Sequence, residues 1–138
     1  MGDVAQLIDV TSRAAENFVA TYYKMFDRQR HVLPQMYKDT SAIVWNGNAL
    51  SGVEQYQQFC LKLPVTDHDV QSVDGQPVVP PGTTDPTRSQ ILVTVTGNVR
   101  YGDERDVKPF QQTFVLCPDP DPSRKGTYFV GSDIFRFI

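Results

Sequence analysis

The strongest constraint on the fold is a change of hydrophobic period near residue 40. Up to residue 37, apolar residues recur at steps of three and four, which is the spacing of one helix face. Beyond it, with one helical interruption, they alternate with polar residues at steps of two, as in strands with one buried side. The sequence therefore predicts helices followed by a sheet. The first helix would bury Leu7, Ile8, Ala14, Ala15, Phe18, Val19, Tyr22, Met25 and Phe26.

Two further helices are expected before the main sheet. Residues 27–37 continue a helical pattern as a shorter second helix, with a bend at the junction because Pro34 fits only a first turn or a break. Residues 51–63 predict a third helix, in which Ser51 and Glu54 have the spacing of a capping box.

The strands are expected on both sides of the Asn46-Gly47 turn and after the third helix. Residues 40–45 are rich in branched and aromatic residues, and Asn-Gly is a strong hairpin signal. Proline-rich connectors at residues 77–89 and 117–126 are expected to be exposed loops. An α+β fold follows, with the helices on one face of an antiparallel sheet, in a single domain of residues 1–138. The four later strands are expected at residues 68–78, 89–101, 109–117 and 127–137.

Composition disfavours several classes of function. The net charge is -3 and the 13 Lys and Arg residues are scattered, so no basic face for nucleic acid is expected. No apolar run approaches the roughly 20 residues of a membrane span, and the N-terminus lacks a signal core, so we expect an intracellular protein. Cys60 and Cys117 stand among apolar residues and are expected to be buried, reduced thiols.

Candidate catalytic groups are few. His68, between Asp67 and Asp69, is the best acid-base candidate, but adjacent polar residues before a strand are more typical of a solvated loop. No Cys or His spacing suits zinc and no glycine motif suits a phosphate, so neither a metal nor a cofactor is expected. The acidic residues 102–106 are interpreted as a solvated hairpin tip. Trp45 either packs under the third helix or lines the open end of a cavity, and the pattern leaves both open.

The second face of the sheet gives the first indication of a function. A sheet that carries apolar groups on its uncovered side most often contacts a second protein. Both alternating sets of the last strand contain such groups, and the same is true of residues 89–101. The two sets of the last strand are Tyr128, Val130, Ser132, Ile134 and Arg136, and Phe129, Gly131, Asp133, Phe135 and Phe137.

Seven ordered sequence blocks resemble the nuclear transport factor 2-like proteins, over about residues 12–137. The resemblance implies a cone-shaped α+β fold, in which three N-terminal helices pack on a strongly bent antiparallel sheet and cover a cavity. Trp45 would line that cavity. The blocks are "FVATYYKMFDRQRHVLPQMY", "VWNGNALSG", "FCLKLP", "SVDGQPV", "VTVTGNVRYGD", "FQQTFVLCP" and "SDIFRF".

Within this family the chain is most similar to the nuclear transport factor 2-related export proteins. The family's homodimeric carriers of Ran-GDP have an acidic residue after the tryptophan, whereas this chain has Asn46. Loss of that carboxylate would remove the charge that holds a Lys or Arg of Ran. Because residues 102–106 stay acidic, weak Ran binding remains open. The resemblance implies a small subunit that pairs with the matching domain of the large mRNA export receptor.

The resemblance also implies a set of partner-binding residues. Dimerisation in the family is sheet against sheet, with an ion pair from the arginine of the terminal "FR" motif, here Arg136. Alternation places Ile134 and Ser132 on the same face as Arg136, and we expect residues of two neighbouring strands to join them. These are Thr94, Thr96, Gln76 and Asp74.

Three functional hypotheses follow. The first is a non-enzymatic adaptor that shuttles between nucleus and cytoplasm, acts at pores of the nuclear envelope, and meets Phe-Gly pore proteins through its partner. The second is a homodimeric Ran-GDP import carrier. The third is a small-molecule isomerase or dehydratase, which the fold alone does not exclude.

Overall fold

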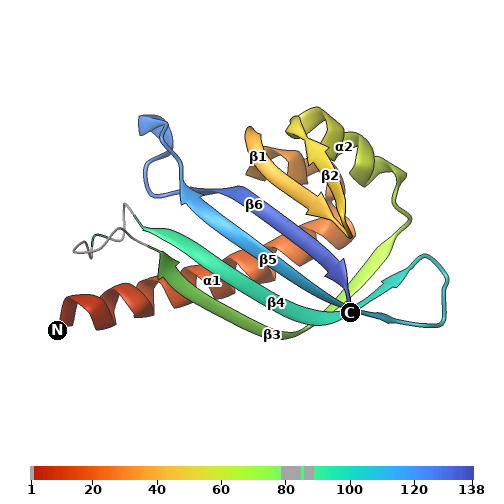
Figure 1. Cartoon of the computed structure of the whole chain (residues 1–138), viewed down its shortest axis with the longest axis horizontal. Coiled ribbons are helices and arrows are strands. Elements are labelled where there is room, and N and C mark those ends of the chain that lie inside the picture. Colours follow the sequence, from red (N-terminus) through yellow and green to blue (C-terminus); the bar gives the residue numbers. More distant parts are fainter. Residues whose placement is uncertain (1, 79–84, 86–88) are drawn as a thin grey trace.

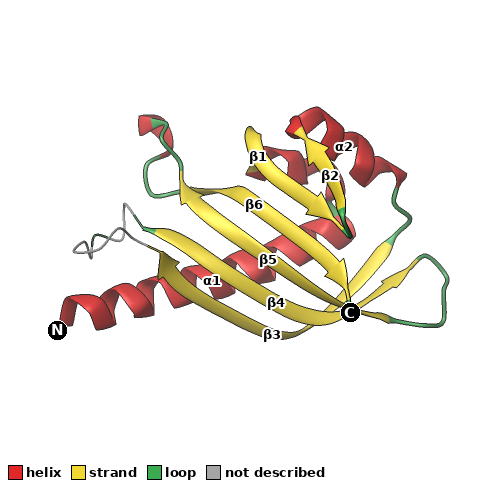
Figure 2. Ribbon diagram, viewed as in Figure 1, coloured by secondary structure: helices red, strands yellow, loops and turns green. Residues whose placement is uncertain are grey.

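The computed structural model describes residues 2–78, 85 and 89–138. Figure 1 shows helices on one side of a single six-stranded sheet, and Figure 2 colours the same view by secondary structure. The expected helices are present as α1 (Gly2–Arg28), η1 (Arg30–Met36) and α2 (Gly52–Lys62). The strands are β1 (Tyr37–Trp45), β2 (Asn48–Ser51), β3 (Thr66–Val78), β4 (Gln90–Tyr101), β5 (Lys108–Pro118) and β6 (Tyr128–Phe137), with a short 3-10 turn η3 (Pro122–Arg124) before β6.

The sheet is mixed rather than wholly antiparallel. Strands β3 to β6 form the expected meander, and the full order is β2-β1-β6-β5-β4-β3. Strand β1 lies parallel to β6, with Val44 opposite Ile134. The antiparallel expectation was wrong for this pair, because the partners are far apart in sequence and local alternation does not report their relative direction.

Helix α1 buries most of its apolar stripe against one face of the sheet, but the expectation was wrong for Ile8, which is 50% exposed because it lies in the N-terminal part of α1, away from the core. Ala15, Val19, Tyr22 and Tyr23 on the helix are at most 4% exposed. They pack in one core with the inward side chains of the central strands, and the N-terminal turns of α1 extend past β3 (Figure 1). The core members on β4 and β5 include Val93, Val95, Val99, Phe110 and Phe114.

The second helix is a 3-10 helix that begins after a bend at Gln29. The Gln29 N–H still bonds to the Met25 carbonyl at 2.7 Å, and Arg30 begins the tighter helix. Pro34 lies inside η1, where its missing N–H costs less than in the interior of an α-helix. The expected bend is therefore present.

The capping box expected at the start of α2 was wrong. Ser51 ends strand β2 and its hydroxyl makes no capping bond. The Ser51 N–H instead donates to the Gln55 side chain at 2.7 Å, and the Val53 N–H donates to Asp39 of β1 at 3.0 Å. The helix is thus capped by a residue from a neighbouring strand, which sequence spacing does not reveal.

The Asn46-Gly47 turn joins β1 to β2 as expected. Both residues have positive φ, 46° and 85°, which suits a two-residue hairpin turn. The Asn46 N–H donates to the Phe135 carbonyl at 2.7 Å, and so the turn is attached to the last strand.

Two glycines allow close approaches that shape the sheet. A side chain at Gly97 would meet the backbone of Asp69, beside the irregularity between Val70 and Ser72 in β3. A side chain at Gly75 would overlap the Cβ of Ala15 on α1. Gly75 therefore sets how closely β3 and α1 pack.

The remaining expectations concern loops, thiols and membranes. The connector at residues 117–126 is largely exposed, whereas most of the connector at residues 77–89 lies outside the described residues. Cys60 is buried and Cys117 half-buried, and both are free thiols. No helix in the described part of the chain is long and apolar enough to cross a membrane.

We expect Gly75→Ala to lower the free energy of unfolding by about 1–3 kcal/mol, because the new methyl group overlaps Ala15 and forces α1 away from β3. Denaturant unfolding measures this. Ala15→Gly alone should cost about 1 kcal/mol in helix propensity. The double variant should lose less stability than the sum of the losses of the two single variants. A loss equal to that sum would contradict the close contact between Gly75 and Ala15.

Candidate functional site

The structure offers two candidate sites on opposite sides of the sheet. One is a narrow cavity between the helices and the inner face. The other is the outer face, which no described helix covers (Figures 1 and 2).

The cavity has a volume of only about 20 Å³, which is room for about one water molecule. Trp45 lines this cavity. Its ring is parallel to that of Phe135, with the ring centroids 5.7 Å apart, and its ring centroid lies 5.2 Å from that of Phe59. Pockets that bind small molecules usually enclose about 300–1,000 Å³. Aromatic side chains therefore fill most of the space in which a substrate would lie.

A buried carboxylate, Asp133, lines the same cavity and lies at the centre of a hydrogen-bond network. It accepts from the Tyr37 hydroxyl at 2.6 Å, from Gln112 Nε2 at 2.7 Å and from the Tyr22 hydroxyl at 3.5 Å. Tyr22 also contacts the hydroxyls of Tyr37 at 2.8 Å and Tyr56 at 3.2 Å. Both carboxylate oxygens are thus satisfied by neutral groups.

The network contains no cation to stabilise the charge of Asp133. Burial raises the pKa of Asp133 to about 6, against the lowering effect of the hydrogen bonds from Gln112, Tyr37 and Tyr22. Burial likewise raises the pKa of Tyr22, Tyr37 and Tyr56 well above 10.0, so these phenols stay protonated and act as donors. The cluster suits an internal support better than an exposed acid or base.

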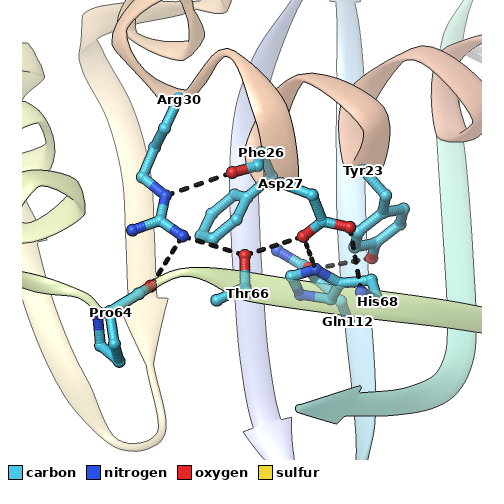
Figure 3. A network of polar contacts seen from close by, with 8 residues as sticks. All are labelled: Tyr23, Phe26, Asp27, Arg30, Pro64, Thr66, His68 and Gln112. Carbon is cyan, nitrogen blue, oxygen red and sulfur yellow. Dashed lines mark hydrogen bonds and ion pairs between the residues drawn. The ribbon is translucent and has the colours of Figure 1, made fainter. Parts of the chain in front are cut away.

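His68 is held by Asp27 of α1 rather than by its sequence neighbours (Figure 3). Its Nδ1 lies 2.6 Å from Asp27 Oδ1, and its backbone N–H donates to Asp27 Oδ2 at 2.9 Å. The His68 side chain is only 3% exposed. The interpretation of His68 as part of a solvated loop was therefore wrong, because a helix that is distant in sequence packs over the start of β3.

The same region joins α1 to α2 through Arg30. The Arg30 guanidinium donates to the Pro64 carbonyl at 2.9 Å and to the Thr66 hydroxyl at 2.9 Å, and Thr66 donates to Asp27 at 2.7 Å (Figure 3). Burial alone would raise the pKa of Asp27, but the hydrogen bonds from His68 and Thr66 outweigh it and lower the pKa. Arg30 also donates to the carbonyls of Phe26, Cys60 and Leu63.

On strands β3 to β6 the outer face includes twelve side chains in three rows. Each row joins residues that are directly opposite one another in the sheet. Among these twelve, only Asp74 on β3 and Arg136 on β6 are charged, and alternation puts Asp69 and Arg100 on the same side of the sheet beyond the three rows. The rows are Gln76, Leu92, Val115 and Ser132; Asp74, Thr94, Thr113 and Ile134; and Ser72, Thr96, Gln111 and Arg136.

All seven partner-binding residues expected from the sequence lie on this outer face. Ser132, Ile134 and Arg136 project from β6, and Ile134 is 49% exposed. Val130, expected on the same side, is instead fully buried, because an irregularity between Val115 and Leu116 shifts the alternation of β6 at Gly131. The remaining four are Thr94 and Thr96 on β4, and Asp74 and Gln76 on β3.

Sequence reasoning missed the interior network and part of the outer face. Asp133 shares its alternating set with Phe129, Phe135 and Phe137, and a carboxylate among aromatic residues was the available signal of burial. Leu92, Thr113 and Val115 were not singled out, because their rows depend on strand register. Among the described residues, no group of three or more His, Cys, Asp or Glu is placed to hold a metal ion.

The fold is of the α+β class, with helices on one face of a mixed sheet, and comparisons with known proteins identify the family. Residues 14–137 match the family model for the nuclear transport factor 2 (NTF2) domain. The chain therefore belongs to the NTF2 domain family.

Individual relatives agree with this assignment. The chain is 36% identical over 135 residues to NTF2-related export protein 1 of Bos taurus, covering 98% of this chain and 94% of that one. The structure of nuclear transport factor 2 from Cryptosporidium parvum is similar with a TM-score of 0.74 and 25% identity, covering 90% of this chain and 91% of that one. A Chaetomium thermophilum structure of the Mex67 NTF2-like domain complexed with Mtr2 also gives 0.74, at 21% identity, covering 91% and 97%.

Asp133→Asn should remove a pH-dependent cost to stability. Because the pKa of Asp133 is raised from 3.8 to about 6 in the folded state, the native protein binds this proton more tightly, and ionisation costs about 3 kcal/mol by pH 7. This cost is absent below about pH 4 and grows as the pH rises through 6. The free energy of unfolding of Asp133→Asn should therefore rise relative to wild type over that range.

Denaturant unfolding of both proteins at pH 4, 5, 6 and 7 provides the measurement. Asp27, whose lowered pKa acts in the opposite direction, is present in both proteins and cancels in the difference. Altered hydrogen bonding of the new amide adds only an offset that does not depend on pH. A difference that stays constant from pH 4 to 7 would refute the buried, ionising carboxylate.

Proposed function

We propose that this protein is a non-enzymatic adaptor that forms a heterodimer with the NTF2-like domain of a large mRNA export receptor. In this role it supports passage of mRNA through the nuclear pore. It would shuttle between nucleus and cytoplasm, and it would meet Phe-Gly pore proteins at the nuclear envelope through its partner.

The observation that carries the proposal is the outer face. A broad, mostly uncharged sheet surface with an exposed Ile134 in its middle row has the composition of a protein interface. Arg136 lies at its border, and within the described residues no ion pair or hydrogen bond involves its side chain. A carboxylate on a partner would satisfy it.

The relatives favour the export role among the proteins of this family. The similarity to an NTF2-related export protein covers nearly the whole chain. The complex of the Mex67 NTF2-like domain with Mtr2 supplies a precedent for pairing between such folds. We extend both to this chain as part of the proposal.

Two alternatives are less well supported. A small-molecule isomerase or dehydratase with its substrate inside the cone would need more than the space of about 20 Å³ found there. A larger, open cleft of about 880 Å³ lies between α1 and β3, where Asp27 and His68 hydrogen-bond to each other. As a homodimeric Ran-GDP carrier, this chain would lack the expected carboxylate, because Asn46 stands at that position. The Asn46 N–H donates to the Phe135 carbonyl and its side-chain oxygen accepts from the Phe137 N–H, so both groups bond to β6.

We expect Arg136→Asp to abolish pairing with the receptor domain while leaving the fold intact. Reversal of the charge places two carboxylates together in the interface, which should weaken binding by more than about a hundredfold. Light scattering of the chain with and without the purified receptor domain measures assembly, and circular dichroism checks the fold.

Arg105→Asp is the matched control, because Arg105 is equally exposed but lies in the loop after β4. It should bind as wild type does. Unchanged assembly of Arg136→Asp would refute the interface role of Arg136. A tight wild-type homodimer that ignores the receptor domain would refute the export proposal, and Ran-GDP would then be the ligand to test.

A further inference from the structure

Two unpaired charges stand at opposite borders of the outer face. Arg136 lies on β6 and Asp74 on β3, and the other ten residues of the three rows are uncharged. Both charged residues are exposed in the isolated chain. The face therefore has a cationic border and an anionic border with a neutral centre.

The two charges are too far apart to neutralise each other. Strands β4 and β5 separate them, and three strand spacings correspond to about 14 Å. That separation exceeds the screening length of about 8–10 Å in physiological salt. They also lie in adjacent rows, with Asp74 opposite Thr94, and Arg136 opposite Gln111.

Neither charge has another partner among the described residues. In the parts of the chain that the structure describes, no ion pair or hydrogen bond joins the side chain of Asp74 or Arg136 to any residue. The nearest side chains along β3 on the same face are Ser72 and Gln76, which are neutral. The Asp74 carboxylate is exposed to solvent.

Covering the outer face removes solvent from both borders. Burying a charge without a counter-charge is strongly unfavourable. A stable interface over both strands therefore requires two opposite charges on the partner. The family resemblance places both Arg136 and Asp74 among the partner-binding residues, but it implies an ion pair for Arg136 only.

We infer that Asp74 is the second charged contact of this interface, and that the partner sheet presents a Lys or Arg over β3 together with a carboxylate over β6. This inference rests on the proposed pairing through the outer face. The partner sheet then carries its negative charge at the β6 border and its positive charge at the β3 border.

The arrangement also fixes the orientation of the partner. A partner sheet turned by half a rotation in the plane of the interface would set its cation against Arg136 and its carboxylate against Asp74. Both contacts would then join like charges, which disfavours that docking. Two unlike charges on opposite borders therefore select one orientation where a single charge would not.

The test compares Asp74→Asn with Asp69→Asn in binding to the purified NTF2-like domain of the mRNA export receptor. Asp69 is the matched control because it is an exposed aspartate of the same strand, opposite Asn98 and outside the three rows. Isothermal titration calorimetry at two salt concentrations gives Kd for each variant. We expect Asp74→Asn to raise Kd about tenfold or more and to reduce its salt dependence, and Asp69→Asn to change Kd by less than about twofold.

The outcomes separate this inference from the proposed function. Equal Kd values for wild type and Asp74→Asn, with the heterodimer formed, would overturn the role of Asp74 and leave the export proposal standing. If wild type assembles only with itself, the proposed function fails, and the same two variants compared in the homodimer decide the role of Asp74. A chain that stays monomeric under both conditions overturns both.

Discussion

The packing of α1 across one face of the sheet is the constraint on which the rest of the molecule depends. Close contact between Ala15 and Gly75 fixes one point of the crossing, and the hydrogen bonds of Asp27 with His68 fix another. Together they press the aromatic residues of α1 into the concave side of the sheet. No described helix covers the opposite side, so the position of α1 decides which face of the sheet is exposed.

The packing of α1 also divides the polar groups discussed above into two sets, one on each side of the sheet. On the inner side, Asp133, Gln112 and the tyrosines satisfy one another and leave almost no empty space. On the outer side, Asp74 and Arg136 remain without partners in the described chain. The polar groups on the inner side are hydrogen-bonded to one another, whereas the two charges on the outer side are paired with no described residue. The proposed adaptor role rests on this contrast.

The sequence predicted the elements well because each carries a local signal. Hydrophobic period placed α1 and the four long strands, and Asn46 and Gly47 marked the turn with positive φ. Long-range pairings were not predictable in this way. The parallel contact of β1 with β6, the capping of α2 by Asp39 and the burial of His68 by Asp27 each join segments distant in sequence. The family resemblance supplied the outer-face residues, and strand register showed that they lie together.

Strand β6 carries Asp133 toward the interior and Ile134 and Arg136 toward the exterior, one position apart. Because side chains alternate, a slip of one residue would bring Asp133 to the surface and drive Ile134 and Arg136 into the core. The hydrogen bonds from Tyr37 and Gln112 hold the carboxylate only in the observed register. A buried acid that is costly for stability thus fixes the register of β6, and the arrangement of the outer face is maintained from inside the protein.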